Sequence, residues 1–204
     1  MMIFFQERLA FLAVPKTGTS ALENALGPKA SAIFRDPPGI KHTNARGFES
    51  KYRKLFERGN LPPLETMAVM REPVDWLGSW FRYRQRPSLA GHPNSTAGLS
   101  FDEFVAAYLS DNQPAFANVG SQARFVTDQG GDLLINHLFS YHDLASAVAF
   151  LERRLDREIT LNSVNLSPKR DVSLSSELSS ELRRACALDF EIYEALMDGP
   201  LSVS

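Results

Sequence analysis

An apolar segment that leads directly into a glycine-containing loop and an amphipathic helix restricts the fold of this chain most. Residues 9–14 are LAFLAV, an unbroken apolar run typical of a strand buried on both faces. The next six residues are PKTGTS, and the apolar side chains of residues 19–26 are spaced as on one side of a helix. Because a strand, a loop and a helix in this order form part of a parallel βα unit, we expect an α/β protein.

The rest of the chain continues this alternation. We expect further strands, which are short, apolar and bounded by turn-forming residues, at residues 3–5, 66–70 and 134–139. Apolar periodicity predicts helices at residues 19–26, 45–58, 74–84, 101–110, 142–155 and 175–196. The clearest helix start is Ser100 with Glu103, the pair of a capping box. The pattern predicts a three-layer α/β fold in which helices flank a central, mostly parallel sheet.

Composition limits the class of protein. A chain of 204 residues, 44% of them hydrophobic, can build one sizeable core, so we expect a single domain over residues 1–204. The net charge of −2 provides no overall basic field that would attract nucleic acid. The single cysteine, Cys186, cannot form an internal disulfide, which indicates a reducing, cytoplasmic location. No segment approaches the roughly 20 apolar residues of a membrane helix, and Glu7 and Arg8 interrupt the apolar start, unlike a secretory signal.

The loop at residues 15–20 is suited to bind an anion. A helix N-terminus presents unpaired backbone N–H groups, Gly18 allows a ligand to approach the backbone, and Lys16 adds a positive charge. The loop also carries three hydroxyl side chains, those of Thr17, Thr19 and Ser20. The alternative is that Ser20 and Glu23 form a capping box while Lys16 faces solvent. The loop is not the triphosphate-binding GxxxxGK[ST], because that pattern does not occur in the chain.

A second motif follows the strand expected at residues 66–70. Arg71 stands at the carboxyl end of that strand, where ligands bind in open α/β sheets. Ser79 lies eight residues later, and on the expected helix it shares a stripe with Asp75. The alternatives are an ion pair of Arg71 with Glu72 or Asp75, and a Ser79 hydroxyl that bonds back to the preceding helical turn.

Together the two motifs resemble those of the sulfotransferases that use 3′-phosphoadenosine 5′-phosphosulfate (PAPS). A strand followed by PKTGTS and a helix is similar to the 5′-phosphosulfate loop of that family, and Arg71 with Ser79 is similar to its 3′-phosphate motif. Weaker similarity to the smaller bacterial and carbohydrate-type branch extends to residues 120–125, 165–167 and 189–193. One departure is Glu72, where many members have aspartate. The resemblance covers nearly the whole chain and implies a sulfotransferase fold similar to that of P-loop NTPases.

The resemblance also implies how the donor would be bound. Lys16 would contact the phosphosulfate and stabilise the bridging oxygen, while Arg71 and Ser79 would hold the 3′-phosphate. The 5′-phosphate would lie in the loop formed by Thr17, Gly18, Thr19 and Ser20. The nucleotide product would be 3′-phosphoadenosine 5′-phosphate (PAP), and no metal is implied.

An acceptor hydroxyl also needs a general base, for which histidine is the usual side chain. His42 lies in a loop at residues 35–46, between the two donor motifs, and its Lys-His step resembles the base-bearing segment of the carbohydrate-type branch. The alternatives are that His42 faces solvent and that Asp36 or Glu49 is the base. The other histidines are His92 in a second loop at residues 85–98, His137 on an expected strand, and His142 at an expected helix start.

We therefore expect a PAPS-dependent sulfotransferase that acts on a hydroxyl or amine of a small-molecule or carbohydrate acceptor. The loops at residues 35–46 and 85–98 would shape the acceptor site, but the sequence identifies neither the acceptor nor the oligomeric state. The alternatives are a kinase-like nucleotide phosphotransferase, which the missing triphosphate loop disfavours, and a non-catalytic nucleotide binder. Lys169 and Arg170 could reach the 3′-phosphate or face solvent. The run of alternating arginines at residues 82–86 does not indicate nucleic-acid binding, given the negative net charge.

Overall fold

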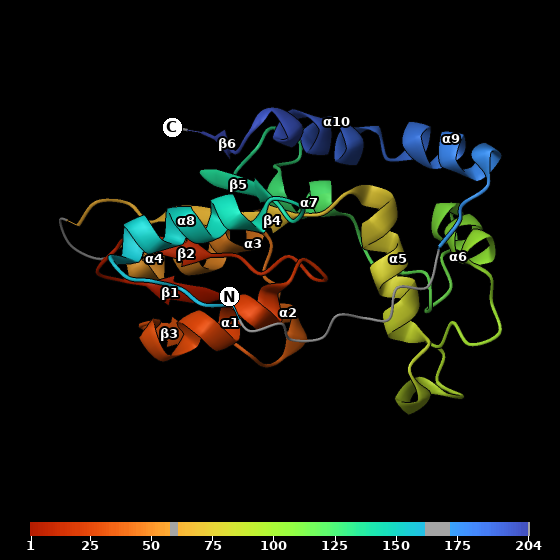
Figure 1. The fold of residues 1–204 in the computed structure, drawn as a ribbon, viewed down its shortest axis with the longest axis horizontal. Helices are drawn as coiled ribbons and strands as arrows, with labels where there is room; N and C mark the ends of the chain where they lie inside the picture. Colours follow the sequence, from red (N-terminus) through yellow and green to blue (C-terminus); the bar gives the residue numbers. More distant parts are fainter. Residues whose placement is uncertain (58–60, 162–171, 204) are drawn as a thin grey trace.

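The computed structural model describes residues 1–57, 61–161 and 172–203. These residues form an α/β structure around a six-stranded sheet with the order β3-β1-β2-β4-β5-β6 (Figure 1). The strands are β1 (Met2–Phe4), β2 (Leu9–Phe11), β3 (Ala32–Ile33), β4 (Glu65–Met70), β5 (His137–Ser140) and β6 (Leu201–Ser202). They include parts of all four strands expected from the sequence.

The sheet is mixed, and not mostly parallel as the sequence predicted. Among the described strands, only the β2–β4 and β4–β5 pairings are parallel. Residues 5–8 form a turn that returns the chain as an antiparallel hairpin of β1 and β2. The short strands β3 and β6 add antiparallel pairings. These two strands have only two residues each, too few to give a periodic signal in the sequence.

Each of the three parallel strands leads into a helix. These helices are α1 (Thr19–Leu26) after β2, α5 (Pro73–Arg84) after β4, and α8 (Leu144–Leu155) after β5. The remaining α-helices are α2 (Pro38–Lys41), α3 (Ala45–Gly47), α4 (Arg53–Phe56), α6 (Phe101–Leu109), α7 (Gln122–Val126), α9 (Ser176–Ala185) and α10 (Ala187–Ala195). A π-helical segment, η2 (Phe48–Tyr52), joins α3 to α4, and short 3₁₀ turns lie at η1 (Gly27–Lys29), η3 (Pro87–Leu89) and η4 (Leu196–Asp198).

Most of the expected helices are present within two residues of their expected ends. The helix at residues 19–26 has the expected bounds, and the capping box of Ser100 and Glu103 is formed. The helix expected at residues 175–196 is broken at Cys186 into α9 and α10. The short helices α2 and α7 were not expected, because four or five residues are too few to show helical periodicity.

Helices cover both faces of the sheet, so its side chains enter two apolar cores. In β2, Leu9 and Phe11 pack into a core with α1 and α8, whereas Ala10 and the following Leu12 pack into a core with α3, α7 and α10. This arrangement follows from the alternation of side chains along a strand. It also explains why these strands are continuous apolar runs, since neither face meets water.

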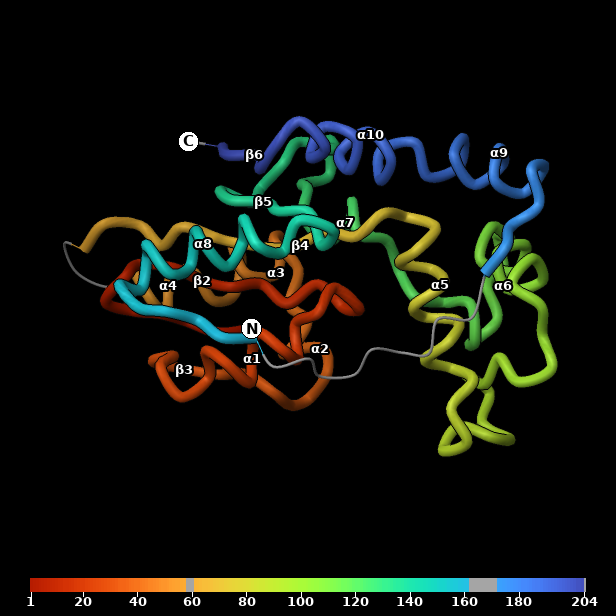
Figure 2. Tube along the Cα trace, viewed as in Figure 1, coloured from red at the N-terminus to blue at the C-terminus, as the bar shows by residue number. Residues whose placement is uncertain are grey.

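A third apolar cluster lies beyond the end of the sheet, where α5 extends away from β4 (Figure 2). It joins α5 to α6 and α9 through buried side chains that include Trp76, Phe104 and Leu182. This packing holds α5 in place, so the polar side chains of α5 are carried on a rigid element. In the part of the chain that the structure describes, no helix is both long and apolar enough to cross a membrane.

Candidate anion-binding site

The two motifs from the sequence meet at one edge of the sheet. The loop at residues 15–20 follows β2, and Arg71 follows β4 directly. Because β2 and β4 are parallel neighbours, their carboxyl ends lie side by side. The Arg71 Nη1 donates to the Lys16 carbonyl oxygen at 3.2 Å, and the Trp76 indole Nε1 donates to the Pro15 carbonyl oxygen at 2.8 Å. These bonds fix the loop against the start of α5.

Among the described residues, the backbone N–H groups at the start of α1 lack backbone acceptors. Gly18 has φ 75° and Lys16 has φ 68°, a conformation that non-glycine residues rarely adopt. Ala21 and Leu22 are the first amides of α1 that find a backbone acceptor in the described chain, and both donate to the Gly18 carbonyl. A Cβ at Gly18 would lie 2.9 Å from the Tyr141 ring, so the loop needs glycine here for space as well as for φ.

The hydroxyl side chains of the loop have different environments. Thr17 is fully buried, and its hydroxyl donates to the Val14 carbonyl at 2.9 Å, so it stabilises the turn. Thr19 is buried at the helix start, whereas Ser20 is exposed. The capping box weighed for Ser20 and Glu23 is absent, since the N-cap of α1 is Gly18. Glu23 instead pairs with two basic side chains, those of Arg35 and Lys41.

The ammonium group of Lys16 is set among aromatic rings and other cations. Its Nζ lies 4.0 Å from the centroid of the Tyr83 ring and 5.6 Å from that of Trp80. Burial, together with nearby guanidinium groups, lowers the pKa of Lys16 to about 8. The guanidinium groups are those of Arg86, Arg71 and Arg82. Such a concentration of positive charge favours binding of an anion.

Arg71 is held by an acidic partner on α5. Its Nε donates to the Asp75 carboxylate at 2.5 Å, and its guanidinium lies 4.5 Å from the centroid of the Tyr141 ring. Burial opposes ionisation of Asp75, but the hydrogen bond and charge of Arg71 hold the pKa of that carboxyl below its ordinary value. The ion pair weighed as an alternative for Arg71 is therefore present. It coexists with the bond from Arg71 to Lys16.

Gln122, at the start of α7, fixes the backbone of Arg71. The Gln122 side chain is fully buried, accepts from the Arg71 N–H at 2.9 Å and donates to the Arg71 carbonyl at 2.7 Å. Its own backbone N–H donates to the Asp189 carboxylate at 3.0 Å. Sequence reasoning included Gln122 only in a stretch of weak resemblance. The contact joins residues 51 positions apart, which local patterns do not reveal.

Ser79 is buried in α5, on the same stripe as Asp75 and Arg82. Asp75, the first residue of this stripe, forms an ion pair with Arg71. Asn165 to Ser167, Lys169 and Arg170 lie outside the described residues.

His42 lies at the carboxyl end of β2, near the start of the loop. Its Nδ1 is 2.7 Å from the Ala13 carbonyl oxygen. Since a carbonyl only accepts, Nδ1 carries the proton, and Nε2 of the neutral ring has its lone pair available. Burial lowers the pKa of His42, which favours this neutral form. Glu49, weighed as an alternative base, is bound to Arg53, and Asp36 is exposed.

The other histidines have different settings. His92 is exposed in its loop, and His137 on β5 is 2.6 Å from the Glu65 carboxylate, as a satisfied strand residue would be. His142 precedes α8 and belongs to the site, since its Nε2 is 3.4 Å from Asp75 and its Nδ1 is 3.0 Å from the Tyr193 hydroxyl. Its position two residues after the parallel strand β5 is the signal that could have identified it.

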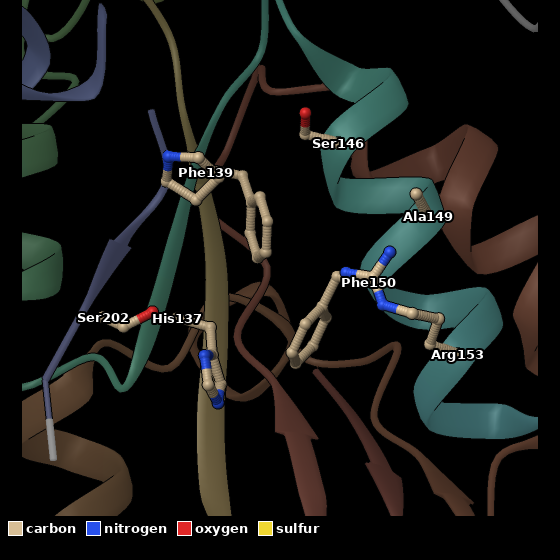
Figure 3. Close-up of a pocket in the computed structure, with 8 residues that line it drawn as sticks. His137, Phe139, Ser146, Ala149, Phe150, Arg153 and Ser202 are labelled. Atoms are coloured by element: carbon tan, nitrogen blue, oxygen red, sulfur yellow. The ribbon is translucent and has the colours of Figure 1, made fainter. Parts of the chain in front are cut away.

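A separate hollow of about 270 Å³ lies between β5, β6 and α8 (Figure 3). Its lining includes Phe139, Phe150 and Arg153 and none of the site residues predicted from the sequence. Among the described residues, no group of three or more His, Cys, Asp or Glu side chains is placed to hold a metal ion. The chain matches no protein-family model, and no curated protein matches its sequence significantly.

Proposed function

We propose that this protein is a sulfotransferase that moves a sulfuryl group from PAPS to a hydroxyl or amine of a small-molecule or carbohydrate acceptor. The observation that carries the proposal is the junction of Lys16 and Arg71, two residues from separate motifs, at one sheet edge. In a PAPS donor, the phosphosulfate and the 3′-phosphate are separate anionic groups on one nucleotide. Two cations on adjacent strand ends suit such a ligand. The proposal includes a sulfotransferase-type nucleotide fold and a cytoplasmic location.

The proposed reaction is an in-line transfer. The bond between sulfur and the bridging oxygen of PAPS breaks, and a bond between sulfur and the acceptor oxygen forms, which releases PAP. Lys16 stabilises the negative charge that develops on the bridging oxygen, as oriented positive groups do in phosphoryl transfer. The open amides at the start of α1 hold the 5′-phosphate. Arg71 and Ser79 hold the 3′-phosphate.

The proton of the acceptor hydroxyl passes to His42 in this proposal. The Ala13 carbonyl holds the proton of the neutral ring on Nδ1, so Nε2 is the atom that accepts. The lowered pKa of His42 keeps this atom unprotonated at neutral pH. His42 is a weaker base for the same reason, so the leaving-group stabilisation by Lys16 is the larger requirement.

Thermal unfolding with different nucleotides tests the proposal without knowledge of the acceptor. A ligand that binds only the native state raises the unfolding temperature. We expect a clear shift with PAP, and a smaller one with adenosine 5′-phosphate, which lacks the 3′-phosphate. A shift only with ATP and magnesium would favour a phosphotransferase instead. No shift with PAP at concentrations well above those of cellular nucleotides would contradict the proposal.

Binding of PAP alone does not distinguish a sulfotransferase from a nucleotide-binding protein. Transfer of radiolabelled sulfate from PAPS to a panel of hydroxylated and amino acceptors makes this distinction. The matched variant is Lys16→Ala, which we expect to remove transfer while the protein still folds. Normal turnover by Lys16→Ala would show that the leaving-group role assigned to Lys16 is wrong.

A further inference from the structure

Asp75 lies between two arginines. Its Oδ2 accepts from the Arg71 Nε at 2.5 Å, and its Oδ1 lies 3.5 Å from the Arg82 Nη2. The two guanidinium groups therefore approach the two oxygens of one carboxylate. Guanidinium groups bind phosphate in the same forked manner as carboxylate. The position of the Asp75 carboxylate thus marks a place where two arginines can hold one anionic group.

Arg82 lacks a full set of partners. The Nε of Arg82 is buried and has no hydrogen-bond partner among the described residues. The side chain lies along α5, because a Cβ at Gly78 would be 3.2 Å from the Arg82 Nη1. A buried charged donor without an acceptor is costly, and native structures usually supply a partner from protein, solvent or ligand. The Asp75 carboxylate provides two acceptor oxygens, whereas a phosphate monoester provides three, so a phosphate could also accept from the Arg82 Nε.

The sequence motif gives no role to Arg82, which lies eleven positions beyond Arg71. Its spacing from Ser79 nevertheless places both residues on one stripe of α5, together with Asp75. Arg82 is also one of the cations that lower the pKa of Lys16. Arg82 therefore faces the same site from the side of Ser79.

We propose that Arg82 is a further binding residue for the 3′-phosphate, and that Asp75 is an internal anion which the phosphate displaces. The inference rests on the proposed function, because it assigns the 3′-phosphate of the donor to this place. In the free protein, the Asp75 carboxylate orients the two guanidinium groups. In the complex, the phosphate oxygens bind Arg71 and Arg82, and the third oxygen is available to the buried Nε.

Isothermal titration of PAP and of adenosine 5′-phosphate tests this inference on the purified full chain. We expect Arg82→Gln to lower the affinity for PAP by about tenfold or more, and the affinity for adenosine 5′-phosphate by less than about twofold. Arg82→Lys keeps the charge but not the fork, so it should lose a large part of the same affinity. Arg86→Gln is the matched control, since it removes one positive charge from a residue that lies two positions beyond the end of α5. It should weaken both nucleotides by the same small factor.

Asp75→Asn separates displacement from simple support. If phosphate displaces Asp75, this variant should bind PAP at least as tightly as the wild type. A tenfold loss of PAP affinity in Asp75→Asn would show that the ion pair supports the site and is not displaced. The melting temperature of each variant without ligand confirms that it folds.

Two outcomes would overturn the role of Arg82. One is an equal loss of PAP and adenosine 5′-phosphate affinity in Arg82→Gln, and the other is an equal effect of Arg82→Gln and Arg86→Gln on PAP. Either result would mean that Arg82 acts only through its general charge. A wild type that binds the two nucleotides equally would instead contradict the assignment of a 3′-phosphate site, and with it the proposed function.

Discussion

The ammonium group of Lys16 lies 4.0 Å from the centroid of the Tyr83 ring. The Arg86 guanidinium lies 4.6 Å from the centroid of the same ring, so one aromatic side chain contacts two cations. The negative face of an aromatic ring attracts a cation, and this attraction offsets part of the hydration free energy that the cation loses on burial. Tyr83 therefore holds Lys16 in position while its charge remains available to a ligand.

This contact predicts that the ring of Tyr83, and not its hydroxyl, supports anion binding. Tyr83→Leu should weaken PAP binding by about two- to thirtyfold, since a cation–π contact of this kind contributes about 0.5–2 kcal/mol. Tyr83→Phe keeps the ring and should bind PAP as the wild type does. Isothermal titration of the three proteins makes the comparison. An equal loss in both variants would assign the effect to the hydroxyl and refute the cation–π explanation.

The lowered pKa of Lys16 predicts a pH-dependent cost to stability. Folding lowers this pKa from 10.5 to about 8, so the native state binds the proton less tightly than the unfolded state. The cost is fully present below pH 8 and declines as the pH rises from 8 to 10.5. Lys16→Met removes the charge, and should therefore stabilise the free protein at pH 7 by about 2–3 kcal/mol.

Chemical denaturation of the wild type and Lys16→Met at pH 7 and pH 10.5 measures this difference. The gain in unfolding free energy of Lys16→Met over the wild type should be present at pH 7 and nearly absent at pH 10.5. Lys16→Met should lose PAP binding and sulfuryl transfer at both pH values. Residues at functional sites often cost stability in this way. A Lys16→Met protein that is less stable than the wild type at pH 7 would show that the ammonium group stabilises the free protein.

The sequence was sufficient to predict the parts of the fold that depend on local patterns. The strand, loop and helix around Gly18 were expected because an unbroken apolar run, a glycine-containing loop and a segment of helical apolar periodicity follow one another there. The antiparallel edges were not, because β3 and β6 have two residues each and their pairing depends on distant parts of the chain. The break between α9 and α10 at Cys186 was not predicted, because no glycine or proline lies there to indicate a helix end.

The candidate site was predicted to the extent that its residues follow strands. Arg71 directly follows a buried apolar segment and Lys16 follows another after Pro15, so both were expected after strand ends. The role of Gln122 could not be predicted, because it depends on a contact between residues 51 positions apart. The position of His142 after a parallel strand indicates the sheet edge, but its contact with Asp75, 67 positions away, could not be predicted. Side chains that act through such contacts show no spacing rule in one sequence.

Substitution of Gly18 separates the effect of backbone strain from that of a steric clash with the Tyr141 ring. Gly18 and Gly91 both have φ 75°, so alanine is strained at both positions. A Cβ at Gly18 would also meet the Tyr141 ring at 2.9 Å, whereas a Cβ at Gly91 would meet nothing within 4 Å. Gly18→Ala should therefore destabilise the protein by about 1–2 kcal/mol more than Gly91→Ala.

Thermal unfolding of the two variants measures that difference, and titration with PAP measures the effect on the loop. We expect Gly18→Ala to lose PAP binding, since displacement of Tyr141 or of the loop moves the open amides at the start of α1. Gly91→Ala should bind PAP normally. Normal PAP binding by a folded Gly18→Ala protein would show that the loop at residues 15–20 does not hold the 5′-phosphate.

His42 provides the test of the proton transfer. In the proposed reaction, Nε2 of the neutral ring accepts a proton, so activity requires the unprotonated form. Because burial lowers the pKa of His42 below 6.5, activity should persist at pH 6.5 and fall only at lower pH. His42→Ala should reduce kcat by about 10²- to 10⁴-fold and leave the Kd for PAP unchanged. His92→Ala, in an exposed loop, is the matched control and should leave the Kd for PAP unchanged and lower kcat far less than His42→Ala does. A kcat of His42→Ala equal to that of His92→Ala would exclude His42 as the base. His142 would then be the next residue to change, since its Nε2 lies 3.4 Å from the Asp75 carboxylate, beside the same arginines.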